Sequence, residues 1–177
     1  NVDPFNHQIH INIGRIFRDN GDLDKAEEHF KLAALISKDY LVFINLGSVY
    51  LDKGLYNQGI QEFNKALQLN PDSFLAHYYL GNAYNDLKEF QKAIQFFEKS
   101  IRLNPDFARA YSNLGYTYWN LEKYDQAYEW FVKAMNKNPE LPTPYLNIGN
   151  YFLRKGNGKQ AEGFLNRYRE KLKNEKE

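Results

Sequence analysis

One residue type that can do chemistry recurs at a nearly fixed spacing along this chain of 177 residues. It is asparagine, which fills four of five equivalent positions, with tyrosine in the remaining one: Asn12, Asn45, Tyr79, Asn113 and Asn147. A side-chain amide offers both a hydrogen-bond donor and an acceptor, so it can pair with the C=O and N–H groups of an extended peptide. Such a ladder would hold a peptide backbone without selecting its sequence. The alternative is that these asparagines bond within or between helices and only stabilise the fold.

The titratable residues give little support for catalysis. The four histidines are His7, His10, His29 and His77. His10 and His77 occupy places that other copies of the pattern described below fill with aromatic residues, which favours a packing role. His7, His10 and Asp3 have a spacing that could bind a metal ion, but nothing else in that segment supports a site, so we predict neither a metal nor a cofactor. No phosphate-binding loop, nucleophile elbow or zinc-helix motif occurs, and we predict that the chain is not an enzyme.

The asparagines belong to a pattern that repeats five times. It is marked by glycines that stand 33, 34, 34 and 34 residues apart: Gly14, Gly47, Gly81, Gly115 and Gly149. An apolar residue precedes each glycine, and an aromatic residue follows three residues later. A tiny residue stands twelve positions after the glycine and a bulky apolar residue sixteen after it. Self-similarity at a fixed period of this length indicates a solenoid of stacked repeats.

Each period predicts two helices joined by a short turn. In the third period, apolar residues at three- and four-residue spacings predict one helix over 73–86 and a second over 91–103. Pro105 ends the second helix, because proline lacks an N–H group and clashes with the preceding turn. The glycine of the first helix and the tiny residue of the second allow two antiparallel backbones to approach closely. We therefore expect an all-α fold of ten helices in five hairpins.

The composition argues against several classes of function. A net charge of +1, from 23 basic and 22 acidic residues, argues against nucleic acid or anionic lipid as the main partner. The absence of cysteine excludes disulfides, thiolate catalysis and cysteine-ligated zinc. The longest apolar stretch, residues 41–51, is too short to span a bilayer, and we expect no membrane insertion. Residues 1–5 resemble the Asn-Pro-Asp boundaries farther along, so we expect a fragment of a longer protein, with the compartment unknown and the cytoplasm favoured.

The Leu-Gly pair, the aromatic residue three positions later, the alanine and phenylalanine columns and the closing proline together resemble the tetratricopeptide repeat, or TPR. The resemblance covers residues 7 to about 175. It implies a right-handed α-solenoid of five helix-turn-helix hairpins, forming one domain over residues 1–177. The implied repeats are 7–39, 40–73, 74–107, 108–141 and 142–175. In such solenoids the first helices of the repeats line a concave groove.

The resemblance also assigns residues to that groove. The predicted peptide-binding residues are Asn12, Asn45, Tyr78, Tyr79, Asn82, Arg109, Asn113, Tyr116, Trp119, Asn147 and Asn150. Tyr116 and Trp119 lie three residues apart on one helix face near Arg109, and aromatic residues beside an arginine are typical of interface hot spots. The alternative for Trp119 is packing against its own hairpin turn. A clamp for a C-terminal carboxylate, found in some family members, is not predicted because the matching places lack its lysines.

These observations favour a protein–protein interaction scaffold that binds an extended or helical partner segment in the groove. We expect a protein or peptide partner and no nucleic acid. Two alternatives stay open. The apolar ends of a solenoid predict self-assembly into dimers or filaments, here through Ile9, Ile13 and Ile16. The chain could also be the substrate-recognition arm of a larger enzyme such as a glycosyltransferase. The partner's identity does not follow, because amides that bind backbone are not selective and one fold serves many functions.

Overall fold

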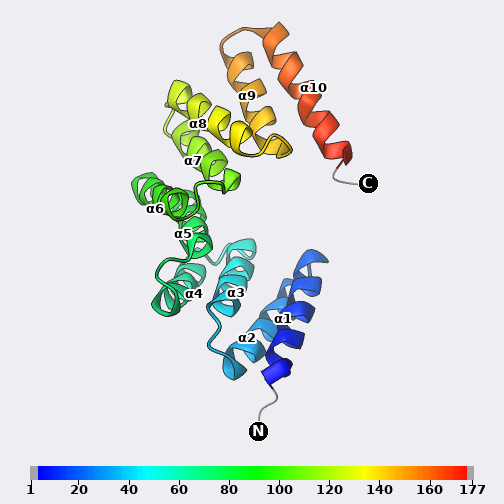
Figure 1. The fold of residues 1–177 in the computed structure, drawn as a ribbon, viewed down its shortest axis with the longest axis vertical. Coiled ribbons are helices and arrows are strands. Elements are labelled where there is room, and N and C mark those ends of the chain that lie inside the picture. The colour runs from blue at the N-terminus through cyan, green and yellow to red at the C-terminus, as the bar shows by residue number, and fades with distance from the viewer. Residues whose placement is uncertain (1–3, 175–177) are drawn as a thin grey trace. The chain divides into compact units, whose positions relative to one another are not determined.

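The computed structural model describes residues 4–174 and the side chains of residues 7–173. Over these residues the chain forms ten α-helices and no strand (Figure 1). The helices are α1 (Pro4–Asp19), α2 (Leu23–Ile36), α3 (Tyr40–Asp52), α4 (Tyr56–Leu69), α5 (Phe74–Asp86), α6 (Phe90–Leu103), α7 (Ala108–Asn120), α8 (Tyr124–Lys137), α9 (Pro142–Arg154) and α10 (Gly158–Asn174). The predicted all-α repeat fold is confirmed. Within this part of the chain, no helix is long and apolar enough to cross a membrane.

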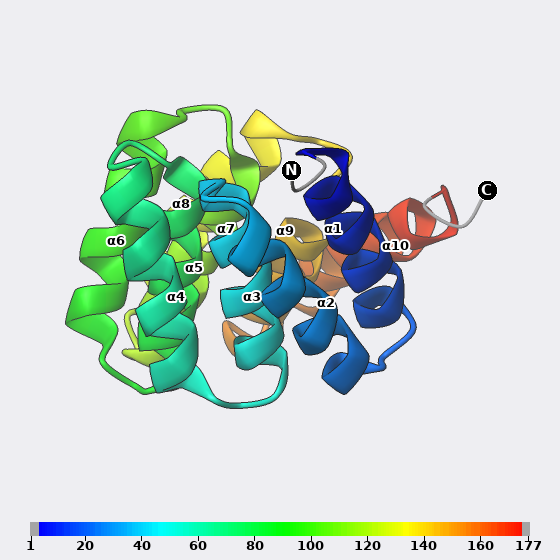
Figure 2. The ribbon, with the colours of Figure 1, turned by 90° about the horizontal axis from the view of Figure 1, so that it is seen from below.

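The chain divides into two compact units, Asn1–Lys92 and Ala93–Glu177. Helices α1 to α5 belong to the first unit and α7 to α10 to the second, while α6 begins just before the boundary between them. Within each unit, consecutive helices pair as hairpins, such as α1 with α2 (Figure 2) and α9 with α10 (Figure 1). The helices predicted over 73–86 and 91–103 are observed as α5 and α6, with each start displaced by one residue.

The glycine of each first helix allows the two helices of a hairpin to pack closely. A Cβ atom added at Gly47 would lie 2.5 Å from Cε1 of Phe63, and one added at Gly115 would lie 2.7 Å from Cδ1 of Phe131. Separations this short are well inside van der Waals contact, so a larger residue would displace the ring. Phe63 and Phe131 are fully buried and pack against the backbone at these glycines, where no side chain intervenes. The close approach predicted from the glycine column is confirmed.

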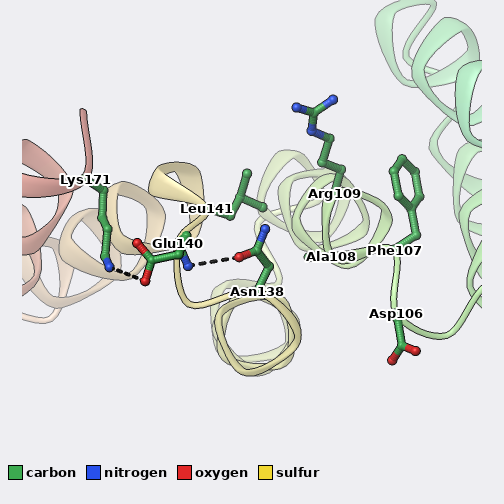
Figure 3. A pocket seen from close by; sticks show the side chains of 8 residues that line it. All are labelled: Asp106, Phe107, Ala108, Arg109, Asn138, Glu140, Leu141 and Lys171. Carbon is green, nitrogen blue, oxygen red and sulfur yellow. Dashed lines mark hydrogen bonds and ion pairs between the residues drawn. The ribbon is translucent and has the colours of Figure 1, made fainter. Parts of the chain in front are cut away.

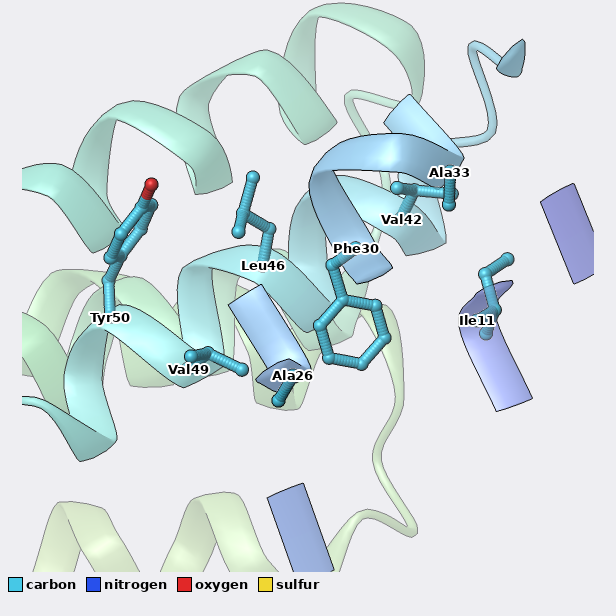
Figure 4. Packing of buried hydrophobic residues seen from close by; sticks show 8 residues of the cluster. All are labelled: Ile11, Ala26, Phe30, Ala33, Val42, Leu46, Val49 and Tyr50. Carbon is cyan, nitrogen blue, oxygen red and sulfur yellow. The ribbon is translucent and has the colours of Figure 1, made fainter. Parts of the chain in front are cut away.

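Neighbouring hairpins within a unit share a hydrophobic core. In the first unit, Phe30 of α2 packs in one cluster with Ile11 of α1 and with Leu46 of α3 (Figure 4). In the second unit, Phe131 of α8 packs in one cluster with Ile148 of α9. Burial of a phenylalanine or isoleucine side chain contributes roughly 1.5–3 kcal/mol to folding. The bulky column of the repeat therefore stabilises both its own hairpin and the junction with the next one.

The five hairpin turns share a backbone feature that the repeat pattern alone did not reveal. The seventh residue after each repeat glycine is left-handed. In three turns it is itself glycine, at Gly21, Gly54 and Gly156, with φ of 81°, 74° and 74°. Lys88 and Glu122 fill the same place with φ of 61° and 60°. A side chain in this conformation costs about 1–2 kcal/mol, so these two turns carry strain that the other three avoid.

The Asn-Pro boundaries between repeats are ordered by the asparagine side chain. Each such side chain accepts a hydrogen bond from the backbone N–H two residues later: Asn70 from Asp72 at 3.3 Å, Asn104 from Asp106 at 3.2 Å, and Asn138 from Glu140 at 3.0 Å. This is an Asx turn, which stabilises a local reversal of the chain. In the second unit it holds Asp106 and Glu140 at equivalent places, one before α7 and one before α9.

A charged network joins the first hairpin to the second. Glu27 of α2 accepts hydrogen bonds from Lys53, which follows α3, and from the Tyr50 hydroxyl at 3.2 Å. Lys31 forms an ion pair with Glu27 at 2.6 Å, and Lys53 forms another with Asp24 at 2.6 Å. Burial raises the pKa of Glu27, but the hydrogen bonds from Lys31 and Lys53 outweigh it and lower the pKa from 4.5 to about 2.

This network predicts a pH dependence of stability. Because folding lowers the pKa of Glu27, the ionised carboxylate stabilises the folded state fully above about pH 4.5. This stabilisation is lost as the pH falls towards 2. The lowered pKa corresponds to at most about 3 kcal/mol, and solvent screening reduces this to about 1–2 kcal/mol. Urea unfolding at pH 7 and pH 3 should show that Glu27→Gln destabilises the protein at pH 7 and by less than half as much at pH 3, where the carboxylate is ionised in the folded state but protonated in the unfolded state. Glu28→Gln, at an exposed position of the same helix, is the control. An equal loss at both pH values would contradict the assignment.

Candidate functional site

The second unit presents a surface formed by α7 and α9, which we call the α7/α9 surface. On α7, Arg109, Asn113 and Tyr116 are separated by four and three residues, so they lie on one helix face. Asn147 and Asn150 have the same three-residue relation on α9. The two helices pack against each other and occupy equivalent places in successive hairpins, so these five residues lie on the same side of the unit.

Large apolar groups are exposed on the α7/α9 surface. Tyr116 is 49% exposed and Leu153 of α9 is 53% exposed. Around them, Arg109 and Asn150 are exposed, whereas Asn113 and Asn147 are half-buried. An exposed aromatic ring flanked by polar groups is a common composition for a contact point in a protein interface. The structure thus brings together the predicted residues of the fourth and fifth repeats.

The hydrogen bonding of the asparagine side chains helps to distinguish the two interpretations of the repeated asparagines, which are peptide binding and stabilisation of the fold. Within the described residues, the side chains of Asn147 and Asn150 form no hydrogen bond, and neither does that of Asn45 in the first unit. The Asn113 main-chain carbonyl accepts a hydrogen bond from the Thr117 hydroxyl at 2.9 Å. A residue kept only for bonding within the fold would be expected to use its side chain. The role of the repeated asparagines in ligand binding stays a prediction.

Trp119 has a different environment from Tyr116. Its half-buried ring lies 4.9 Å from that of Tyr124, edge to face, and 6.5 Å from that of Phe131, so it packs against its own hairpin. The Arg154 guanidinium lies 3.7 Å from the centre of the Tyr124 ring. These contacts match the packing alternative considered for Trp119, and a contact between Trp119 and a ligand stays a prediction. Substitution of Trp119 would therefore disturb the fold as well as any interface.

In the first unit, the predicted residues are more involved in packing. The Tyr79 ring stacks on Phe63 of α4 at 5.4 Å, and Tyr78 lies edge-on to Tyr79 at 5.2 Å. Asn12 is exposed and accepts a hydrogen bond from Gln8 at 3.2 Å. Asn45 and Asn82 are half-buried. An ion pair of 2.6 Å between Arg18 of α1 and Asp52 of α3 spans neighbouring first helices.

A cavity of about 470 Å³ adjoins Arg109 at the start of α7 (Figure 3). It is lined by Asp106, Phe107, Ala108, Arg109, Asn138, Glu140, Leu141 and Lys171. Two ion pairs involve its lining residues: Lys171 with Glu140 at 2.7 Å and Lys137 with Asp106 at 2.9 Å. The residue pattern did not predict this cavity. A signal was present, because each acidic residue follows an Asn-Pro pair and has a lysine 31 residues later.

Three of the four histidines, His10, His29 and His77, have structural contacts. His10 Nδ1 lies 3.0 Å from His29 Nδ1 between α1 and α2, and His77 Nε2 lies 3.1 Å from the Pro71 carbonyl oxygen. Asp3, the third member of the metal combination considered above, lies outside the described residues. Among the described residues, no group of three metal-ligating side chains comes together.

Family models match most of the chain. A model described as tetratricopeptide repeat matches residues 74–107 and 108–141, a second with the same description matches 7–40, and one described as TPR repeat matches 47–87. The chain is also 31% identical over 65 residues to the human protein O-mannosyl-transferase TMTC1, but it spans only 7% of that protein's length. That similarity therefore does not establish an enzymatic function.

Solved structures show the same fold. The crystal structure of MamA is 30% identical to this chain, covers 92% of it over 96% of its own length, and gives a TM-score of 0.71. The Pseudomonas aeruginosa pilF structure covers 93% of this chain over 76% of its own length with a TM-score of 0.82, and at 19% identity it shows the fold alone. Repeat folds of this kind are protein–protein interaction scaffolds, which indicates protein partners. The matched repeats, together with the glycine and phenylalanine columns, establish that this chain belongs to the tetratricopeptide repeat family.

Proposed function

We propose that this chain holds an extended or helical segment of a partner protein on the α7/α9 surface. The observation that carries the proposal is an exposed apolar pair, Tyr116 and Leu153, beside the amides of Asn147 and Asn150, which bond to no other described residue. An aromatic ring can bury against a partner side chain. The amides can pair with the partner's backbone N–H and C=O groups.

The predicted residues of the α7/α9 surface would make different kinds of contact with the partner segment. Asn113 and Asn147 provide hydrogen bonds to the backbone of the partner segment. Tyr116 is the main anchor for a partner side chain, with Trp119 as a further aromatic contact. Arg109 pairs with a polar or acidic group. Tyr116 contributes the largest share of the binding free energy, because exposed aromatic rings bury much area and lose little conformational freedom on binding.

Photo-crosslinking tests where the segment binds. Peptides would be selected on the wild-type chain from a displayed random-peptide library. A benzoylphenylalanine would then replace Tyr116 in one sample and Asn136, which is exposed on α8, in another. The proposal predicts crosslinks from position 116 to the selected peptides and none from position 136. Crosslinking from position 136 alone, or equal yields from both positions, would place the peptide elsewhere.

Self-assembly is a second candidate, because α1 has exposed apolar side chains. Ile9 is 54% exposed and Ile16 is 59% exposed, and with the half-buried Ile13 they lie along one face of α1. The third alternative, a recognition arm of a larger enzyme, depends on sequence beyond this chain.

If α1 mediates self-association, the molar mass measured by light scattering should rise with protein concentration. Ile9→Asp should abolish that rise, because a buried carboxylate in an apolar interface is costly. Gln8→Asp, at the adjacent exposed position, is the control for added charge. A molar mass that stays at the monomer value of 20.9 kDa at all concentrations would exclude this candidate.

A further inference from the structure

The α7/α9 surface has an unbalanced charge. Arg109 is the only charged residue within α7, and Arg154 is the only charged residue within α9, so neither helix contains an aspartate or a glutamate. The corresponding helices of the first unit are different, because each contains an aspartate: the one charged residue of α3 is Asp52, that of α5 is Asp86, and α1 contains Asp19 besides Arg15 and Arg18. The surface that carries the exposed Tyr116 and Leu153 is therefore also the one whose helices provide only positive charge.

The two arginines are not equivalent. The Arg154 guanidinium lies over the Tyr124 ring at 3.7 Å. Arg109, in contrast, is exposed and forms no hydrogen bond, ion pair or ring contact with any described residue. Arg154 is thus held by its face against the Tyr124 ring, whereas both the face and the N–H edge of the Arg109 guanidinium are available to a ligand.

Arg109 has no ion-pair partner among the described residues because the carboxylates that line the cavity beside it are paired with lysines. Its two carboxylates, Glu140 and Asp106, are paired with Lys171 and Lys137 respectively. Figure 3 shows the Arg109 side chain extending away from Asp106. Because both carboxylates are neutralised by lysines, an anionic group that approaches Arg109 meets little repulsion from them. Phe107, Ala108 and Leu141 supply the apolar part of the cavity's lining.

We propose that the partner segment held on the α7/α9 surface is acidic, and that Arg109 pairs with an aspartate or glutamate of that segment at the mouth of the cavity. This inference rests on the proposed function and adds the chemistry of the partner. A guanidinium presents a planar pair of N–H donors that matches the two oxygens of a carboxylate. The carboxylate lies close to the side chain that fits beside Tyr116, because Arg109 and Tyr116 are on the same face of α7.

The experiment uses peptides selected on the wild-type chain from a displayed random-peptide library. The selected set should be enriched in aspartate or glutamate near an apolar residue. For one such peptide, replacing its acidic residue with the matching amide should weaken binding about tenfold, as expected for a hydrogen-bonded charge pair. Arg109→Gln should weaken binding of the acidic peptide by a similar factor. Combining the two changes should add little further loss, because both remove the same pair.

Matched variants separate this inference from a general effect of charge. Arg102→Gln removes an exposed arginine at the end of α6 and should leave the affinity unchanged, while Arg109→Lys should restore only part of it. Selected peptides without acidic enrichment, or an unchanged affinity in Arg109→Gln, would overturn the inference. If Tyr116→Ala still abolished binding in that case, the proposed function would stand without it. If Tyr116→Ala also had no effect, the proposed function would fail as well.

Discussion

Replacement of Gly115 with valine is expected to lower the free energy of unfolding by about 3 kcal/mol or more, because overpacking at a close helix contact forces the backbones apart. A Cβ atom there would lie 2.7 Å from both Cδ1 and Cε1 of Phe131 and 3.1 Å from the Ala127 carbonyl oxygen. Phe131 is almost fully buried and also packs with Ile148 of the next hairpin, so it has little room to move. Denaturant unfolding followed by circular dichroism measures the loss.

The same unit contains a matched control for this variant. Gly163 lies inside α10, and a Cβ atom added there would meet no atom within 4 Å. Gly163→Ala should therefore stabilise the protein by about 0.5–1 kcal/mol, through the better helix propensity of alanine alone. The two substitutions differ in direction because one glycine is needed for a contact and the other is not. A stable Gly115→Val protein would show that the hairpin tolerates a wider separation than the repeat pattern indicates.

The second large effect concerns binding. The double variant Tyr116→Ala/Asn150→Ala should weaken affinity for a peptide selected on the wild-type chain by about 100-fold. A truncated aromatic anchor costs about 2 kcal/mol or more, and a lost hydrogen bond costs about 0.5–1.5 kcal/mol. Both residues are exposed, so the variant should keep its fold and stability. Fluorescence anisotropy with a labelled peptide gives the dissociation constants.

A control pair tests whether this loss is local. Leu35 on α2 and Asn136 on α8 are also exposed, and Leu35→Ala/Asn136→Ala removes an apolar and an amide side chain without touching the α7/α9 surface. Its affinity should equal that of the wild type. Trp119→Ala is a poorer probe, because it also removes packing against Tyr124 and Phe131. Equal affinity in both double variants would show that the segment binds to another surface.

The helices and their packing could be predicted from the sequence because every repeat has the same types of residue at the same positions. The period alone gave the boundaries of α5 and α6 to within one residue. The contact between Gly115 and Phe131 followed from the coincidence of a glycine with a bulky residue sixteen positions later. Such features depend on local periodicity and on one helix pairing, and both are visible in the residue pattern.

The environments of individual site residues could not be predicted in the same way. Tyr116 and Trp119 share a helix face, yet one ring is exposed and the other packs on Tyr124, because Trp119 lies near the end of α7 and meets the first residue of α8. The cavity beside Arg109 depends on residues from three separate segments of the chain, including Lys171 in α10. The left-handed Lys88 and Glu122 were hidden because glycine fills that place in only three of the five turns.

The most direct test of the proposed function is to observe the asparagine side chains themselves. In a ¹H–¹⁵N correlation spectrum of the labelled chain, each side-chain amide gives its own pair of signals, which respond to new hydrogen bonds. On addition of a selected peptide, the account predicts that the largest shifts fall on the side-chain amides of Asn113, Asn147 and Asn150 and on the backbone amides of α7 and α9. Unchanged signals from these residues, with shifts confined to other helices, would contradict the proposal that the α7/α9 surface holds the partner segment.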